Sequence, residues 1–341
     1  MKTTLRTSLG VIALAGLLTA CSDEAPKQAA APAASSSSES TSATPVADNK
    51  LETRFATIAT GGASGPYNII ATTMGEIFNK TYGVNSKTQT TGASVENVNL
   101  MAQNKVELAF LMSDVLSDAL NGEGSFQAPV TNVQQIAALY PNYVQIVTSK
   151  KSGIKTLSDL RGKRVAVGAQ NSGVEVNARN LLNGHDISYG DLRVDYLGYA
   201  EAADALKAGK LDAAFLTSGL PNASLLELEQ SFDLQLVSIE AENIERIAQD
   251  KSYFVSLQIP ANTYGNDEPV ATAAIMNALA VRSDLSQDDV YKLTKTFFES
   301  LPQLRNSHQA MNDVSVETAQ QGLVAPLHPG AQQYYDELVA D

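Results

Sequence analysis

The sequence has one cysteine, no tryptophan and three histidines among 341 residues. A single cysteine, Cys21, excludes an internal disulfide and a zinc site built from several cysteines. Because Cys21 lies so close to the N-terminus, we expect no thiol nucleophile in the folded part of the chain. The histidines, His185, His308 and His328, fall in no recognisable catalytic or metal-binding motif. The sequence therefore predicts a protein that is not an enzyme and holds no metal or cofactor.

Positive charge is also scarce. The chain has 24 lysines and arginines against 37 aspartates and glutamates, which gives a formal net charge of −13. Such a chain is poorly suited to bind nucleic acid or an anionic membrane surface. An anion site must therefore depend on local donors rather than on long-range attraction.

Apolar runs of membrane-spanning length are missing as well. Lys2 and Arg6 precede an uncharged stretch at 7–20, which is shorter than an ordinary membrane span and is typical of a signal peptide. The stretch ends in Leu18–Cys21, which resembles the bacterial lipobox, so we expect a lipoprotein signal peptide at 1–20 and lipidation of Cys21. The alternative is a plain signal peptide followed by an incidental cysteine.

Residues 21–50 are mostly serine, alanine, threonine and proline and include no aromatic residue. This composition cannot bury enough apolar surface to offset chain entropy, so it predicts a flexible tether. The protein is expected on the periplasmic or cell-surface side of a bacterial membrane, held by its lipid. Ser22 stands where an aspartate usually retains lipoproteins in the inner membrane, which leaves the outer membrane open as the location.

Two segments, Lys105–Ser113 and Lys210–Ser218, read almost alike. Each lies downstream of a strand, a loop of small residues and a helix, with the strands at 55–60 and 164–168. The repeat predicts one α/β unit used twice, which is a common way to build two lobes around a cleft. The alternative is a chance likeness between two buried strands.

Five predicted junctions between a strand and a helix are rich in glycine and hydroxyl side chains: 60–67, 90–94, 113–114, 170–175 and 218–221. Glycine lets the backbone approach a ligand, and a helix start offers unpaired N–H groups that favour a carboxylate or phosphate. The loops lack the glycine patterns of nucleotide sites. Tyr67 and Tyr140 are candidates for the walls of the site, with core packing as their alternative, and each serine can instead serve only as a helix cap.

Eight short segments, in order along the chain, resemble the TAXI-type solute receptors of tripartite ATP-independent periplasmic (TRAP) transporters. They are Thr60–Tyr67, Gly92–Asn97, Leu139–Pro141, Asp159–Gly168, Ser172–Ala178, Gly219–Ala223, Ile259–Tyr264 and Pro326–Gly330. The resemblance implies an α/β, two-lobed periplasmic-binding-protein fold of type II-like form, with the ligand cleft between the lobes. From the order of the chain, which should cross between the lobes near 145–148 and again near 257–263, we expect lobe I to comprise 51–144 and 262–341, and lobe II to comprise 145–261.

The resemblance also implies the function. A receptor of this kind closes on a small anionic solute, glutamate-like or a dicarboxylate, and delivers it to a TRAP-type membrane component driven by an ion gradient. The alternative is a sensing receptor that passes its closed state to a signalling partner without transport. The likeness and the loops together assign these ligand-binding positions: Thr60, Gly61, Gly62, Ala63, Ser64, Tyr67, Gly92, Ala93, Ser94, Ser113, Asp114, Tyr140, Ser172, Gly173, Val174, Ser218, Gly219 and Leu220.

The chain departs from the family pattern at three positions near the expected cleft. Asn68 follows Tyr67 where a second tyrosine is frequent, Met112 stands where a glutamine is common, and Val174 replaces a frequent threonine. Each change alters a hydrogen-bonding group, so the ligand of a relative cannot simply be transferred to this chain.

Overall fold

The computed structural model describes residues 49–340. The predicted signal peptide, Cys21 and nearly all of the predicted tether lie outside the described residues.

One mixed sheet runs through the described chain. Its strands are β1 (Phe55–Ala59), β2 (Asn85–Gln89), β3 (Leu108–Met112), β4 (Val133–Ser149), β5 (Arg164–Ala166), β6 (Arg193–Asp195), β7 (Ala213–Ser218), β8 (Leu234–Val237), β9 (Val255–Ile259) and β10 (Val270–Arg282). Their order is β2-β1-β3-β10-β4-β7-β5-β6, with β8 paired to β4 and β9 paired to β10.

Helices cover the sheet. They are α1 (Pro66–Tyr82), α2 (Ser94–Ala102), α3 (Ser113–Asn121), α4 (Gly173–Gly184), α5 (Tyr199–Lys207), α6 (Ala223–Glu229), α7 (Ala241–Ala248), α8 (Gln287–Glu299), α9 (Leu301–Ser307) and α10 (Pro329–Ala340). Short 3₁₀ helices occur at η1 (Leu157–Leu160), η2 (Tyr189–Asp191) and η3 (Gln309–Asp313).

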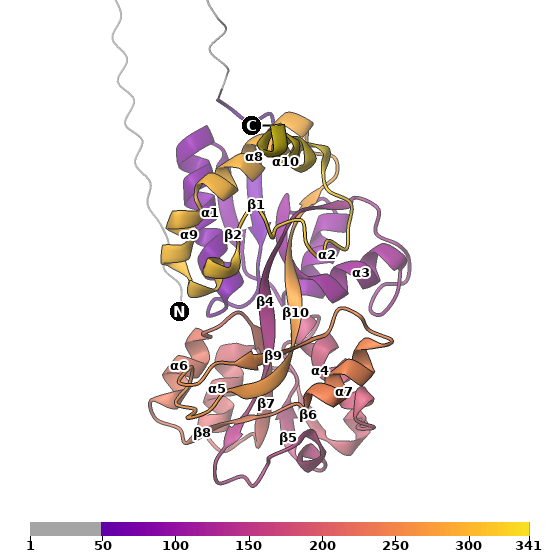
Figure 1. Ribbon diagram of the computed structural model, residues 1–341, viewed down its shortest axis with the longest axis vertical. Coiled ribbons are helices and arrows are strands. Elements are labelled where there is room, and N and C mark those ends of the chain that lie inside the picture. Colours follow the sequence, from indigo (N-terminus) through magenta and orange to yellow (C-terminus); the bar gives the residue numbers. More distant parts are fainter. Residues whose placement is uncertain (1–48, 341) are drawn as a thin grey trace, which may run out of the picture. The chain divides into compact units, whose positions relative to one another are not determined.

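The elements form two lobes joined by two long strands. Figure 1 shows β4 and β10 running side by side along the long axis, between an upper group of elements and a lower group. We call the upper group, with β1 to β3, α1 to α3 and α8 to α10, lobe I, and the lower group, with β5 to β8 and α4 to α7, lobe II. The predicted two-lobed α/β fold is confirmed.

The repeated segments occupy equivalent places in the two lobes. β3 lies between β1 and the long strand β10, and β7 lies between β5 and the long strand β4. The neighbours β1 and β3 are parallel, as are β5 and β7. Each lobe thus contains the same succession of strand, helix, strand, helix and strand, and the predicted use of one α/β unit twice is confirmed.

Burial explains why these segments form strands and helices. All five residues of β3 are buried, as expected for a strand covered by helices on both faces. In α1 the buried residues Ile70, Met74 and Phe78 recur every four positions and so form one apolar face. This face packs into the lobe I core with Phe110 of β3. The equivalent core of lobe II contains Phe215 of β7.

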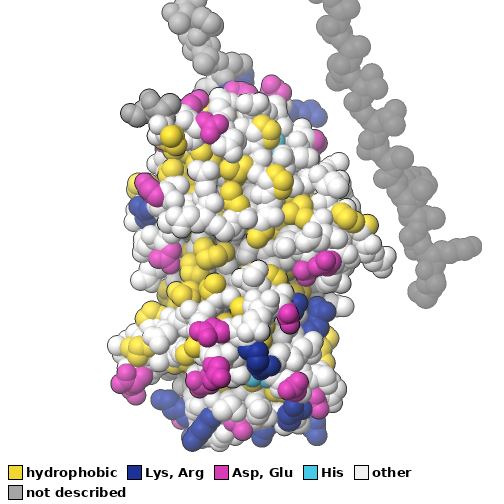
Figure 2. Space-filling model, turned by 45° about the vertical axis from the view of Figure 1, so that its right-hand side comes forward, with side chains coloured by type: hydrophobic (Ala, Val, Ile, Leu, Met, Phe, Trp, Pro, Cys, Tyr) yellow, Lys and Arg dark blue, Asp and Glu magenta, His cyan; other side chains and the backbone are white. Residues whose placement is uncertain are grey.

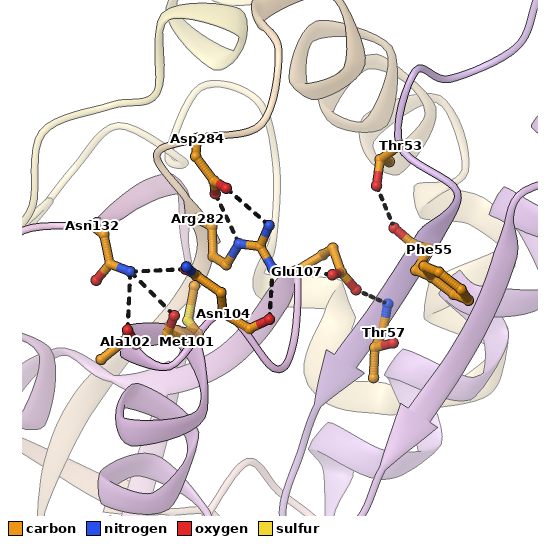
Figure 3. A network of polar contacts seen from close by, with 10 residues as sticks. All are labelled: Thr53, Phe55, Thr57, Met101, Ala102, Asn104, Glu107, Asn132, Arg282 and Asp284. Carbon is orange, nitrogen blue, oxygen red and sulfur yellow. Dashed lines mark hydrogen bonds and ion pairs between the residues drawn. The ribbon is translucent and has the colours of Figure 1, made fainter.

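An ion pair ties the end of β10 to the start of β3 in lobe I. Figure 3 shows Arg282 between Asp284 and Glu107, and Glu107 reaching onward to Thr57 of β1. The Arg282 guanidinium lies 3.2 Å from one Glu107 oxygen, and the two side chains are only 14% and 11% exposed. The other Glu107 oxygen accepts the Thr57 N–H at 2.8 Å. One carboxylate therefore links three strands of the sheet.

Replacing Arg282 with methionine should lower the free energy of unfolding by about 3 kcal/mol, because Glu107 would stay buried without its cation. Chemical denaturation measures the change. A matched control is Lys150→Met, which breaks the exposed pair with Asp233 and should cost less than about 1 kcal/mol. Equal losses for the two variants would contradict this role of the Arg282 pair.

Candidate functional site: a cavity between the lobes

A cavity of about 420 Å³ is lined by residues of both lobes. Lobe I contributes its strand-to-helix loops, and lobe II contributes the equivalent loops. The lining residues are Gly61, Gly62, Ala63, Ser64, Gly65, Pro66, Tyr67, Thr90, Thr91, Gly92, Ala93, Met112, Asn142, Ala169, Ser172, Val174, Gly198, Tyr199, Ala200, Glu201, Thr217 and Ser218. The volume suits a small metabolite.

Four helices begin at this cavity. The residues that precede α1, α2, α4 and α5 are Gly65, Ala93, Ser172 and Gly198, and all of them line it. The first N–H groups of a helix have no partner within the helix, and its N-terminus carries a partial positive charge. Two helix starts come from each lobe, so the cavity presents amide donors from both sides.

The loops before these helices are held by their own hydrogen bonds. In lobe I the Gly92 N–H donates to the Glu96 carboxylate at 2.6 Å, and the Ala93 N–H donates to the Thr91 hydroxyl at 3.0 Å. In lobe II the Ser172 hydroxyl accepts the Glu175 N–H at 3.1 Å and caps α4. The starts of α2 and α4 are thus held in place by the protein's own hydrogen bonds.

Two tyrosines form aromatic parts of the wall. The ring of Tyr67 stacks on Phe110, with the centroids 5.2 Å apart, and its hydroxyl donates to the Asn277 side chain. Burial raises the pKa of Tyr67 well above its usual value, so it stays neutral. On the lobe II side, Tyr199 donates to the Thr217 carbonyl at 2.6 Å. Both hydroxyls are thus bonded to the protein, which leaves the rings as packing surfaces.

The cavity has almost no charged side chain. Among the residues within 49–340 that line it, Glu201 at the start of α5 is the charged one, and it is negative. Figure 2 shows a mid-height belt that is mostly hydrophobic and uncharged, while lysines and arginines on that face gather mainly over the lower half. Binding of an anion here would therefore depend on main-chain amides and neutral hydroxyls.

The lobes touch each other beside the cavity. The Glu96 N–H of α2 donates to the Asn171 carbonyl of lobe II at 3.2 Å. Asn177 of α4 donates to the Asp114 carboxylate of α3 at 2.6 Å. At Gly92, an added Cβ would lie 2.7 Å from the Gln170 carbonyl oxygen. Residue 92 must lack a side chain for this approach, because a Cβ cannot fit at that distance.

Asp114 is fully buried at this contact. Burial raises the pKa of its carboxyl to about 7, and the neighbouring Asp118 adds to the rise. Hydrogen bonds from the backbone and from Asn177 oppose the rise in pKa without cancelling it. Its second oxygen has no partner within the described chain. Burial therefore favours the protonated form of Asp114, while the hydrogen bond from Asn177 by itself favours the ionised form.

Many of the predicted ligand-binding residues line the cavity: Gly61, Gly62, Ala63, Ser64, Tyr67, Gly92, Ala93, Ser172, Val174 and Ser218. They come from four of the five predicted junctions. The Ser218 hydroxyl is already engaged, since it accepts from Gln145 and from Asn222 at 2.9 and 3.0 Å. The repeat thus brings loops that are distant in the sequence to one place.

The other predicted residues lie behind the wall: Thr60, Ser94, Ser113, Asp114, Tyr140, Gly173, Gly219 and Leu220. Ser94 is the first residue of α2 rather than its cap, and its hydroxyl accepts the Met112 N–H at 3.1 Å. Tyr140 is fully buried in the lobe I core. Gly219 packs against Tyr140, where an added Cβ would lie 2.8 Å from the ring.

Several lining residues were missed at the sequence level, among them Asn142, Gly198, Tyr199, Glu201 and Thr217. A signal existed for 198–201, because this junction between β6 and α5 is the lobe II equivalent of 92–94 and the repeat predicts it. Asn142 lies in the middle of β4, which also contains Gln135 and Gln145, so the sequence gives no indication that Asn142 in particular lines a site. Thr217 immediately precedes a predicted serine.

Residues 49–340 contain no group of three or more His, Cys, Asp or Glu side chains arranged to hold a metal ion. Between the same limits, no helix combines the length and apolar character that crossing a membrane requires.

Comparison with solved structures defines the class of fold. A protein from Bordetella bronchiseptica RB50 superposes with a TM-score of 0.52 at 18% identity, over 84% of this chain and 83% of the other. A structure described as a periplasmic transporter gives 0.51 at 13% identity, over 85% and 94%. A binding-protein component of an ABC phosphonate transporter from Pseudomonas aeruginosa gives 0.50 at 13% identity, over 75% and 78%. The fold is that of the two-lobed periplasmic binding proteins.

Within this class the sequence can be placed more closely. Residues 58–338 match the NMT1-like family, and the chain belongs to that family. The match begins in β1 and ends in α10, so it spans both lobes and every loop of the cavity.

Proposed function

We propose that this protein is an extracytoplasmic receptor that binds a small anionic solute between its lobes. The observation that carries the proposal is the convergence of four helix N-termini, two from each lobe, on one cavity. Amide donors at helix starts bind carboxylates without a positive side chain. A ligand that bonds both lobes favours the closed arrangement, because it gains contacts there that an open form lacks.

The ligand is a small carboxylate, glutamate-like or a dicarboxylate. The cavity volume of about 420 Å³ and the neutral donors of its loops support a compact anion over a nucleotide or a lipid. The Pseudomonas protein is a component of a phosphonate transporter. A phosphonate is an oxyanion, like a carboxylate, and backbone amide donors can bind either group.

The protein is proposed to deliver its solute to a TRAP-type membrane component. The likeness of eight segments to TAXI-type receptors supports this partner. The competing hypothesis is delivery to an ABC transporter, which is driven by ATP, because the Pseudomonas protein of similar fold is a component of such a transporter. Uptake into vesicles that hold the partner separates the two, since a TRAP system needs an ion gradient and an ABC system needs ATP.

Two further parts of the proposal concern the chain outside and between the lobes. Lipid attachment at Cys21, followed by the tether 21–50, would hold the receptor at a membrane.

The hinge between the lobes is the second part. The sequence analysis expected the lobe boundaries between residues 144 and 145 and between residues 261 and 262. We propose instead the middle of β4 and β10, near Asn142 and Ile275, because these strands pair with each other there and continue into both lobes.

A thermal-shift screen tests the proposed binding. A small carboxylate present at about 100 times its Kd should stabilise the fold by about 2.7 kcal/mol, because it binds the folded state alone. For a domain of this size that raises the Tm by several degrees. Matched amides and amines of the same carbon skeleton serve as controls. A cation or an uncharged lipid that raises the Tm where no carboxylate does would contradict the proposal.

A further inference from the structure

Two residues that line the cavity carry buried side-chain oxygens with no partner. Within the described chain, neither Asn142 Oδ1 nor Thr217 Oγ1 has a hydrogen-bond partner. Asn142 is 1% exposed and Thr217 is fully buried. Polar atoms buried in a protein are nearly always bonded, so an unpaired oxygen beside a cavity calls for an explanation. Because both residues line the cavity, we infer that a bound ligand supplies the missing partner.

The orientation of the Asn142 amide is fixed by a chain of hydrogen bonds that starts at the backbone. The Asn277 side-chain N–H donates to the Tyr140 carbonyl at 2.9 Å, so the Asn277 oxygen must be an acceptor. Asn142 Nδ2 donates to that oxygen at 2.7 Å and to the Tyr67 hydroxyl at 3.1 Å. A flipped Asn142 would bring two acceptor oxygens together. Its Oδ1 is therefore the atom left over, and it can only accept.

Thr217 adds a second group of similar character. It lies on β7 beside the cavity, and its backbone carbonyl is already bonded to Tyr199. The hydroxyl remains able to accept a hydrogen bond or to donate one. The charged residue of the lining, Glu201, adds carboxylate oxygens that accept hydrogen bonds. The cavity thus combines amide donors at the helix starts with acceptor oxygens on β4 and α5 and with a hydroxyl on β7 that can also accept.

We propose that Asn142 and Thr217 determine specificity by requiring a hydrogen-bond donor on the ligand. The ligand class is a carboxylate that also carries a hydroxyl or ammonium group, and a plain dicarboxylate is disfavoured. This inference rests on the proposed function of the cavity. A site built to bond a polar substituent rejects the analogue that lacks it, because its buried acceptors would be left unpaired.

The unmodified protein provides the first test. Calorimetric titration compares probes with one carbon skeleton: L-glutamate and 2-hydroxyglutarate, which carry a donor, against glutarate, which does not. The four-carbon set of L-aspartate, malate and succinate repeats the comparison. We expect the tighter donor-bearing member to bind about 10- to 100-fold more strongly than the plain diacid. Equal affinities within both sets would overturn the inference while leaving the proposed function intact.

Failure of all six probes to bind, with the protein folded, would instead remove the proposed function, and the inference would fall with it. Binding of a plain diacid alone would overturn the inference by itself. The two failures are therefore distinguishable by whether any carboxylate binds at all.

Variants then assign the discrimination to the named residues. Asn142→Leu should reduce the ratio of affinities between donor-bearing and plain ligands to near one, and Thr217→Val should reduce it several-fold. Thr217→Val keeps the branched shape of the side chain and removes an oxygen that makes no hydrogen bond within the described chain. This variant should therefore fold, and it can still test the ratio of affinities if Asn142→Leu does not fold.

The matched control is Ser224→Ala. Ser224 Oγ is likewise buried and unpartnered within the described chain, but Ser224 does not line the cavity. Its variant should keep the full ratio of affinities. If Asn142→Leu keeps the wild-type ratio, the assignment of specificity to these residues is contradicted. If Asn142→Leu does not fold, an unchanged ratio in Thr217→Val contradicts it.

Discussion

Replacing Gly92 with alanine is expected to weaken solute binding on the order of 100-fold, or about 2.7 kcal/mol. The added Cβ would lie 2.7 Å from the Gln170 carbonyl oxygen and 3.1 Å from a Glu96 carboxylate oxygen. Gln170 belongs to lobe II and its carbonyl is backbone, so relief requires the lobes to move apart. A variant that populates the closed form less binds more weakly in proportion.

The fold itself should tolerate this change. Each lobe keeps its core, so the free energy of unfolding of the ligand-free Gly92→Ala variant should change by less than about 1 kcal/mol. Gly190→Ala is the matched control, because its added Cβ would meet only the Ser188 hydroxyl at an ordinary 3.5 Å. Titration calorimetry of both variants measures the effect. Unchanged affinity in Gly92→Ala would show that solute binding does not need this contact.

The second large effect concerns pH and Asp114. Its carboxyl pKa is raised to about 7, chiefly by burial, against 3.8 for a free aspartate. The stability gained from its proton is fully present below about pH 4 and is lost as the pH rises through 7. We expect Asp114→Asn to stabilise the protein at pH 8 by on the order of 3 kcal/mol and to flatten its pH dependence between 4 and 8.

The groups around Asp114 support this direction. Asp118, one turn along α3, adds negative charge and disfavours ionisation of Asp114. The neighbouring tyrosines, Tyr67 and Tyr253, stay neutral because burial raises the pKa of each. Lys251 and Arg179 lower the pKa of Asp118 rather than acting as the main partners of Asp114. Asn177 of lobe II can still donate a hydrogen bond to the side-chain oxygen of an asparagine at position 114.

Denaturation at pH 5 and pH 8 measures this linkage, with the exposed Asp195→Asn as the control variant. Asp114 is buried against α4 of the opposite lobe, and opening of the lobes would let its ionised carboxylate reach water. Solute affinity of the wild-type protein should therefore also fall from pH 6 to pH 8, and this fall should vanish in Asp114→Asn. A wild-type protein that is equally stable at both pH values would contradict the account of Asp114.

The sequence contained much of the fold because the repeat is local and periodic. Lys105–Ser113 and Lys210–Ser218 became β3 and β7, in equivalent positions of the two lobes. Glycine and serine loops at strand ends have a physical reason to lie at one sheet edge, which is why loops such as 60–67 and 90–94 meet at the cavity. The repeat also predicts the junction at 198–201, where glycine and tyrosine resemble no familiar motif.

Residues outside the loops were beyond the reach of this reasoning. Asn142 acts through partners at 67 and 277, and only folding brings these positions together. The sequence could not show which of the predicted capping serines line the cavity, because Ser94 and Ser172 have the same local pattern. One hydroxyl bonds the backbone of a neighbouring strand and the other caps a helix at the cavity. The local sequence does not distinguish these two structural roles.

The central claim is that a carboxylate is held by amides at four helix starts, and one measurement addresses it directly. A ¹H–¹⁵N NMR titration with the tightest-binding carboxylate of the six probes follows each backbone amide of the folded protein. The claim predicts the largest shifts at helix starts of both lobes, at Tyr67, Val95, Val174 and Ala200. Shifts confined to one lobe, or centred on surface residues away from the cavity, would contradict it.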